Sequence, residues 1–419
     1  LALHQYHPGA VSKRPLTQVA KNNLRSPPAF VEYAYYVILT YSITATAWGV
    51  AVNMLGAASL AVLAAYCAMQ MRPLTILRLI AFPLGCAASF LLVQLLVHDE
   101  GLLRAYVTWI FGLIIIQSLC FRKGFLHRFA WATFVIGLML LPYLNLEAVH
   151  SGDVGRAGLE GRVGYGNSND LAAWFGFCAV YFFIFGMLSK DLVKTVVSWT
   201  VAALCLGVVG LTVSRGGLLA VAMAVTVALR GKLKGAFVPL MMLMFMGWVA
   251  FEAGVFEGIV SSYSERAFEE SGRLVVWPAV VERFLNAPLF GVGESNVDTW
   301  APGANNPTSP HNGFLYVGLA GGIFPLVFFC CYWFKASSAL FHPTQRSTER
   351  PFVGPLLVYT FIVVSLSNTP FMFPLAMVTL STAVWMASQD KQLPRTVSRK
   401  VRNRCSHIRR RMTTVETQI

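Results

Sequence analysis

Four basic side chains stand where apolar segments meet polar connections, and their chemistry suits one kind of reaction. Arg215 interrupts the apolar stretch LCLGVVGLTVSRGGLLAVAMAV, Arg273 begins an apolar-periodic segment, and Arg162 lies in GRVGYGNSNDLA. His311 ends a long polar stretch in SPHNGFL. A guanidinium group stays charged and binds phosphate through two hydrogen bonds, whereas an imidazole with an unperturbed pKa of about 6.5 can accept a proton at physiological pH. Together these groups would suit a phosphate leaving group and a hydroxyl nucleophile.

Each of these polar positions also has a plainer interpretation. Arg215 could extend its charged end to lipid headgroups, and Arg273 could be an ordinary solvated arginine. Asn169 or Asp170 could cap the helix that follows, as Asn312 could cap the helix after the long polar stretch. A histidine taken alone is structural more often than catalytic. The functional hypothesis therefore depends on these residues acting together.

The composition defines the class of protein. Of the 419 residues, 56% are hydrophobic and 12% are charged, and the mean hydropathy is +0.59. This is too apolar for an ordinary soluble globular protein, and apolar runs near the ~20 residues that cross a bilayer as a helix recur along most of the chain. Long apolar runs give helices rather than the alternating strands of a membrane barrel. We predict an all-α, polytopic integral membrane protein.

Twelve membrane spans are predicted from these runs. They divide the chain into an N-terminal cytoplasmic segment 1–29, a transmembrane domain 30–388 and a basic cytoplasmic tail 389–419. The transmembrane domain includes a large outer loop at 257–312, between the ninth and tenth spans. The predicted spans are 30–49, 52–70, 74–97, 102–120, 125–144, 169–188, 194–213, 216–230, 235–256, 313–334, 352–368 and 371–388.

The distribution of charge predicts the orientation. Lys and Arg gather in alternate connections and in the tail, whereas the other connections hold Asp and Glu, so the positive-inside rule places both termini in the cytoplasm. The formal net charge of +14 then reflects anchoring at anionic lipid headgroups, and we predict no nucleic-acid partner. The basic connections include Arg72, Arg122, Lys123, Lys190, Lys194, Arg230, Lys335 and Arg350.

Searches for other motifs give little. There is no P-loop, no HExxH and no GxSxG, and GVGESN has only two glycines of a dinucleotide fingerprint, so it predicts a tight turn. Glu269 and Glu270 are adjacent, so their side chains would diverge on a helix and we predict no metal site. Within the outer loop, SGRLVVWPAVVERFLNAPLFGVG has apolar residues at helical spacing before Pro288, which predicts an amphipathic helix near the outer membrane surface.

The pattern resembles the O-antigen ligases, within the larger group of O-antigen ligases and polymerases. The local signals are SRGG, then GRLVVWPAVVERFLNAPLFGVG, then SPHNGFL, in this order. The resemblance also covers the membrane architecture across essentially the whole chain, including the large outer loop between spans nine and ten.

The resemblance implies a function and a set of site residues. This family joins a glycan carried on undecaprenyl diphosphate to lipid A–core oligosaccharide at the periplasmic face of the bacterial inner membrane, by a metal-independent, inverting glycosyltransfer without a cofactor. The implied partners are the lipid-linked donor, the lipid A–core acceptor and membrane lipids. The implied catalytic residues are Arg215 and Arg273, which would bind the diphosphate, and His311 as general base; the implied substrate-binding residues are Arg162, Asn312 and Asn169.

Three other functions remain open from the sequence. An O-antigen polymerase uses the same donor but extends another lipid-linked glycan, and a protein O-oligosaccharyltransferase uses a Ser or Thr hydroxyl as acceptor. A transporter or flippase would place ionisable residues near the bilayer midplane, often with repeat symmetry. Arg78 is the only charge well inside a predicted span and no repeat is evident, which favours an enzyme.

Overall fold

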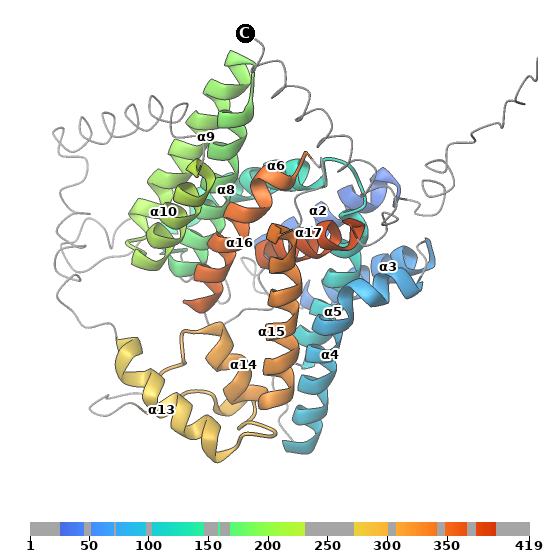
Figure 1. The fold of residues 1–419 in the computed structure, drawn as a ribbon, viewed down its shortest axis with the longest axis vertical. Helices are drawn as coiled ribbons and strands as arrows, with labels where there is room; N and C mark the ends of the chain where they lie inside the picture. Colours follow the sequence, from blue (N-terminus) through green and yellow to red (C-terminus); the bar gives the residue numbers. More distant parts are fainter. Residues whose placement is uncertain are drawn as a thin grey trace, which may run out of the picture.

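The computed structural model is almost entirely helical (Figure 1). It describes residues 26–45, 52–70, 73–97, 103–145, 158–159, 168–230, 272–300, 307–341, 348–366 and 374–390. The α-helices are α2 (Ala29–Ala45), α3 (Val52–Gln70), α4 (Pro73–Val97), α5 (Leu103–Leu119), α6 (Phe125–Leu140), α8 (Ser168–Leu188), α9 (Leu192–Leu211), α10 (Arg215–Leu229), α13 (Gly272–Asn286), α14 (Gly313–Gly321), α15 (Ile323–Ser337), α16 (Arg350–Ser365) and α17 (Pro374–Asp390). Shorter elements are the 3-10 helices η2 (Leu141–Tyr143), η3 (Glu294–Asn296) and η4 (Ser338–Phe341), and the antiparallel pair β1 (Leu144–Asn145) and β2 (Gly158–Leu159).

The helices confirm a helical membrane protein. Five helical stretches within the described ranges are long and apolar enough to cross a membrane. Further shorter helices are also apolar. The number of spans, their orientation and the outer loop remain predictions, and the predicted ninth span at 235–256 lies outside the described residues.

The predicted tenth span, 313–334, is not one helix but two. α14 ends at Gly321 and α15 begins at Ile323. Gly322 between them has a φ of +81°, which breaks the helix. The chain therefore enters this region through a short helix before the long helix α15 begins.

α8 is the central helix of one half of the molecule. Its apolar side chains are buried almost all round, because α6, α9, α10 and α16 pack against different faces of it. The Tyr359 hydroxyl of α16 donates a hydrogen bond to the carbonyl oxygen of Ala173 in α8 at 2.7 Å. Glycine at position 176 lets this tyrosine approach, because a Cβ there would lie 2.4 Å from the tyrosine oxygen. Close packing of this kind fixes the position of the α8 N-terminus.

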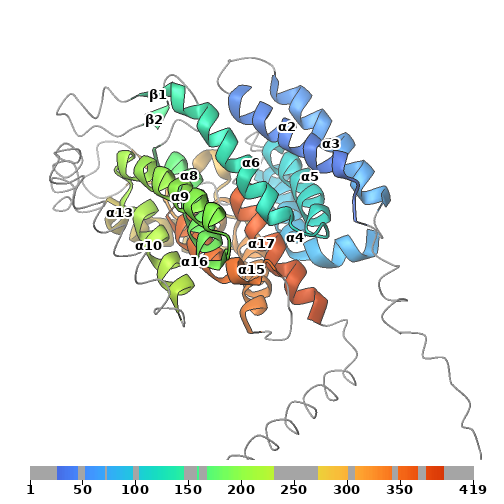
Figure 2. The same cartoon turned by 90° about the horizontal axis from the view of Figure 1, so that it is seen from above.

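The other half of the molecule is built on α4, α5, α14, α15 and α17. α15 lies alongside α4 in Figures 1 and 2, and the Lys335 ammonium at its C-terminal end donates to the carbonyl oxygens of Arg78 at 2.6 Å and Leu79 at 3.2 Å. In the view from above, α2 and α3 form one edge of the molecule and α9 and α10 the opposite edge (Figure 2). α16 packs on helices of both halves, so it joins them.

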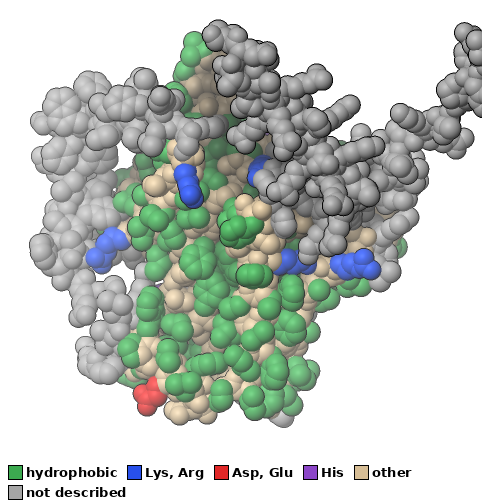
Figure 3. Space-filling model, viewed as in Figure 1, with side chains coloured by type: hydrophobic (Ala, Val, Ile, Leu, Met, Phe, Trp, Pro, Cys, Tyr) green, Lys and Arg blue, Asp and Glu red, His purple; other side chains and the backbone are tan. Residues whose placement is uncertain are grey.

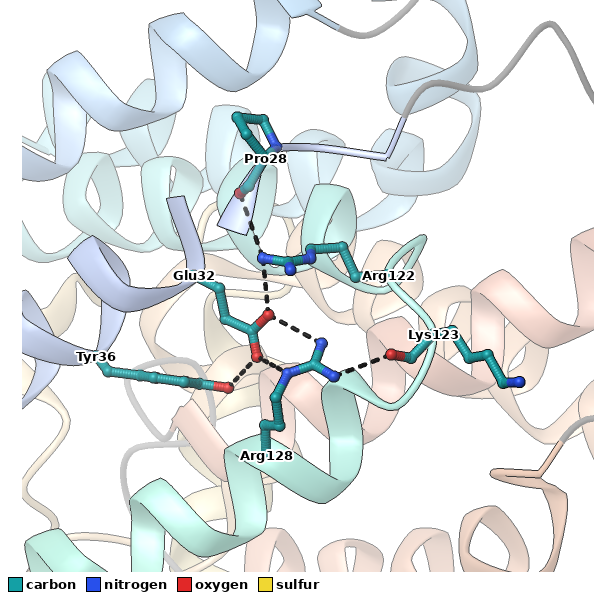
Figure 4. A network of polar contacts seen from close by, with 6 residues as sticks. All are labelled: Pro28, Glu32, Tyr36, Arg122, Lys123 and Arg128. Carbon is teal, nitrogen blue, oxygen red and sulfur yellow. Dashed lines mark hydrogen bonds and ion pairs between the residues drawn. The ribbon is translucent and has the colours of Figure 1, made fainter. Parts of the chain in front are cut away.

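A buried ionic cluster fastens α2 to the turn between α5 and α6 (Figure 4). Glu32 is only 2% exposed and accepts from Arg128 at 2.7 and 2.9 Å, from Arg122 at 3.0 Å and from the Tyr36 hydroxyl at 2.7 Å. A buried carboxylate is tolerated because several charged and polar donors satisfy it. The sequence interpretation assigned no role to Glu32, although it lies in a predicted span.

Surface charge is unevenly distributed. On the face shown in Figure 3, Lys and Arg side chains lie in the upper and middle parts, and hydrophobic side chains cover most of the lower part. On this face the basic side chains thus lie away from the part where hydrophobic side chains predominate, and the orientation in the membrane remains a prediction.

Candidate functional site

The turn between α9 and α10 has an unusual backbone conformation. Val213 has a φ of +49°, and its amide donates to the carbonyl oxygen of Gly210 at 3.0 Å. Helices often end in this left-handed conformation, usually with glycine, because other residues pay about 1–2 kcal/mol for it. A buried, β-branched valine here is a true outlier that the surrounding packing must hold in place. Backbone strain of this kind concentrates at functional sites.

The SRGG sequence at the start of α10 has a structural explanation. Ser214 caps the helix, and its hydroxyl accepts from the Gly217 amide at 3.2 Å. A Cβ on Gly216 would lie 2.9 Å from Leu366 at the end of α16, and one on Gly217 would lie 2.9 Å from an alanine methyl of α8. The two glycines therefore let the first turn of α10 pack directly on both helices. Arg215 is left exposed at a helix N-terminus, where the positive end of the helix dipole also favours anions.

Asn169 lies next to this turn. Its side-chain oxygen accepts a hydrogen bond from the Ser214 hydroxyl at 3.0 Å, so it links the N-terminus of α8 to the residue that precedes Arg215. Because α8 already begins at Ser168, the prediction that Asn169 or Asp170 caps this helix is wrong. The structure thus brings two of the predicted site residues, Asn169 and Arg215, into one neighbourhood.

His311 and Asn312 stand at the start of α14. The Asn312 side-chain oxygen accepts from the backbone amides of Phe314 at 3.0 Å and Leu315 at 3.2 Å, which confirms the predicted cap. His311 is half-buried and has a φ of +48°. Within the described part of the chain, Val213 and His311 are the non-glycine residues with positive φ. One strained position immediately precedes SRGG and the other is the histidine of PHN, so both lie at segments that the sequence singled out.

The break between α14 and α15 fixes the position of α14. The loop after α13 lies against it, through hydrogen bonds from Val292 N to Leu319 O at 2.8 Å, from Gly293 N to Ala320 O at 3.1 Å and from Ile323 N to Pro288 O at 2.8 Å. Two backbones can approach so closely only at glycine. A Cβ on Gly291 would lie 2.4 Å from the carbonyl oxygen of Leu319, and one on Gly322 would lie 2.2 Å from the carbonyl oxygen of Leu289. GVGESN is thus a tight turn, as predicted, and it docks onto α14.

A buried carboxylate in this turn was missed by the sequence interpretation. Glu294 accepts a hydrogen bond from the Tyr316 hydroxyl of α14 and another from the Gln94 amide of α4 at 3.3 Å. It therefore joins the turn that follows α13 to two helices. The only signal in the sequence was one acidic residue in a glycine-rich turn, and the pattern does not show that it is buried.

The C-terminal end of α16 connects the two strained segments. Leu366 meets the first turn of α10, and Phe361 lies with its ring centroid 5.7 Å from that of Phe314 in the first turn of α14. In Figure 1 this end of α16 points down between α10 and α14. The N-termini of α10 and α14, with Arg215 and His311, therefore flank the same end of one helix.

The remaining predicted residues are less fully described. Arg273 lies in the first turn of α13, as expected for the amphipathic helix, but its side chain is outside the described part. Arg162 lies wholly outside the described residues. In the ranges that the structure describes, no group of three or more His, Cys, Asp or Glu residues could hold a metal ion.

Comparison with known proteins supports the resemblance. The fold defines a helical membrane protein, and residues 200–330 match the family model described as O-antigen ligase. This match supports the O-antigen ligase superfamily, and the matched region contains Arg215, Arg273 and His311. No curated protein and no solved structure matches the chain.

Proposed function

We propose that this protein transfers O-antigen polysaccharide from undecaprenyl diphosphate to a sugar hydroxyl of lipid A–core oligosaccharide, at the periplasmic face of the bacterial inner membrane. The observation that carries the proposal is the coincidence of backbone strain with the family signals. Val213 immediately precedes SRGG, and the second strained residue is His311 itself. Strain is retained where it positions functional groups.

The proposed transfer follows from the chemistry of the three residues. The acceptor hydroxyl attacks C1 of the donor sugar and loses its proton to His311, while the bond between C1 and the phosphate oxygen breaks. Arg215 and Arg273 stabilise the negative charge that grows on the departing diphosphate. Attack from the side opposite the leaving group inverts the configuration at C1. Because two guanidinium groups neutralise the diphosphate, the proposed reaction needs no divalent cation.

In this proposal Asn169 and Asn312 position the segments that carry Arg215 and His311. Asn169 orients the turn that carries Arg215 through its bond with Ser214, and Asn312 fixes the start of α14 beside His311. Arg162 remains a proposed contact to the glycan or the diphosphate.

An O-antigen polymerase or a protein O-oligosaccharyltransferase is the alternative. These reactions share the lipid-linked donor, and only the acceptor differs, so the product distinguishes them. The family match supports the class of reaction without naming the acceptor.

The test uses purified protein in liposomes with an undecaprenyl-diphosphate-linked glycan and lipid A–core, in the presence of EDTA. We expect glycan-bearing lipid A from the wild type, and a loss of about 10²- to 10³-fold in rate for Arg215→Ala, typical of one electrostatic contact in the transition state. Arg230→Ala, at the other end of α10, is the matched control and should retain activity. A longer lipid-linked glycan in place of the expected product would assign the protein as a polymerase.

A further inference from the structure

A groove of about 510 Å³ lies beside α13, on a side of the outer-loop region that the proposed chemistry does not use. This volume is within the range of about 300–1,000 Å³ that is typical of small-molecule sites. One wall is formed by residues of α13 and the other by the loop that leads toward His311. The residues that line it are Ala279, Glu282, Arg283, Asn286, Ser295, Asn296, Asp298, Thr299, Trp300 and Pro307.

α13 presents three different faces, about 120° apart at 3.6 residues per turn. Val276 and Val280 form the buried face. Val281 and Leu285 form an exposed apolar face, 41% and 66% exposed, which suits contact with the membrane surface. The third face, at spacing i, i+3, i+4 and i+7, is the wall of the groove. An amphipathic helix on a membrane needs one face toward the protein and one toward the membrane. The polar groove face is a third face, so it requires a separate explanation.

The opposite wall is held in place before any ligand arrives. The Arg283 guanidinium donates to the carbonyl oxygens of Asp298 at 2.7 Å and Asn296 at 2.9 Å, and to the Thr299 hydroxyl at 3.0 Å. Thr299 and Thr308 exchange two backbone hydrogen bonds, of 2.9 and 3.0 Å. A site fixed in this way loses little conformational entropy when it binds.

The lining residues favour a sugar over a phosphate. Among the described lining residues the cation is Arg283, which is engaged with the loop, while Glu282 and Asp298 add negative charge that opposes an anion. Carboxylate, amide and hydroxyl groups suit the alternating donors and acceptors of sugar hydroxyls. Trp300 is 61% exposed and offers a flat apolar surface on which one face of a pyranose ring can pack.

The groove is also connected to the proposed catalytic residue. The bridge between Thr299 and Thr308 ends three residues before His311. The indole N–H of Trp277 in α13 donates to the carbonyl oxygen of Pro310 at 2.9 Å. The helix that forms the groove thus also supports the segment that carries His311.

We propose that this groove is a saccharide-binding subsite, in which a pyranose ring of a glycan substrate packs on Trp300 and hydrogen-bonds to Glu282, Asn286 and Asp298. The proposal rests on the proposed function for the source of the glycan. That source is either the polysaccharide of the donor or the core oligosaccharide of the acceptor.

Binding is measured directly, without turnover, by saturation-transfer NMR titration of the full-length protein in detergent. The two probes are lipid-free core oligosaccharide and the same core carrying O-polysaccharide, each released by mild acid from lipopolysaccharide of the source bacterium; binding of the second alone assigns the site to the polysaccharide. We expect wild type to bind at least one probe and Trp300→Ala to weaken that binding about tenfold, as expected for loss of an aromatic contact. Trp300→Phe should restore most of the affinity, which excludes misfolding as the cause.

Leu285→Ala is the matched control, because it shortens an exposed side chain of the same helix outside the groove. Equal affinity of wild type and Trp300→Ala for both probes would overturn the subsite, as would no binding by wild type. A ligation assay on the same samples separates the two proposals. Ligation by wild type with a Trp300→Ala variant unchanged in KM refutes the subsite alone, whereas Trp300-dependent binding without ligation refutes the proposed function alone.

Discussion

Gly291→Ala tests how α14 is held in position. The Cβ of alanine would lie 2.4 Å from the carbonyl oxygen of Leu319 and 2.7 Å from the amide nitrogen of Gly322. Both contacts are to backbone, so no side-chain rotation can relieve them. Gly291 also has a φ of +66°, which costs a residue with a Cβ about 1–2 kcal/mol.

The magnitude follows from the contacts that would be lost. Three backbone hydrogen bonds hold the turn against the break between α14 and α15, and each contributes about 0.5–1.5 kcal/mol. If the turn moves away to avoid the clash, the strain is relieved but these hydrogen bonds are lost. The expected destabilisation is therefore about 2–5 kcal/mol.

Thermal unfolding in detergent, followed by ligation activity at a temperature where both proteins are folded, provides the assay. Gly207→Ala in α9 is the control, because a Cβ there meets nothing within 4 Å and alanine favours helix, so it should be neutral or stabilising. A Gly291→Ala protein with the melting temperature and activity of wild type would show that the turn does not hold α14.

Three further predictions concern single interactions. Glu32→Ala should destabilise the protein by about 1–3 kcal/mol, which is less than for a fully buried pair because Arg122 and Arg128 are partly exposed. The control is Lys194→Ala, which removes an exposed ion pair and should change stability by under ~0.5 kcal/mol. Equal melting temperatures would contradict this. Asn312→Ala should cost about 1 kcal/mol and Asn312→Asp little, measured by denaturation, because aspartate also caps helices. Burial raises the pKa of the Glu349 carboxyl, so ionisation of this group destabilises the fold as pH rises from the ordinary pKa through the raised value. The Glu349→Gln protein should therefore be more stable than wild type at pH 7 but not at pH 4. A difference in stability that is the same at both pH values would refute this reasoning.

The helices of this protein could be predicted from sequence because hydropathy is a local property. Apolar length alone indicated helices over 52–70 and 169–188, and the structure has α3 at Val52–Gln70 and α8 at Ser168–Leu188. The break at Gly322 was missed, because glycine in an apolar run is also tolerated within a helix. Only the approach of a loop from elsewhere in the chain shows why the helix must stop there.

The candidate site was predictable only where its features depend on local sequence. Residue type and the family resemblance singled out Arg215 and His311, and local pattern gave the cap at Asn312. Burial of Glu294 depends on α4 and α14, and the left-handed backbone of Val213 opposes the residue's own preference. Tertiary contacts create both features, so neither has a signal within its own segment.

The most direct test of the account is the ligation rate of His311→Asn. Alanine at this position would confound two effects, because it removes the imidazole and disfavours a φ of +48°, whereas asparagine tolerates that backbone conformation. With lipid-linked donor and lipid A–core in EDTA, we predict a His311→Asn protein with the melting temperature of wild type and a rate lower by about 10²- to 10⁴-fold. A folded His311→Asn protein that makes glycan-bearing lipid A at the wild-type rate would contradict the assignment of His311 as the general base.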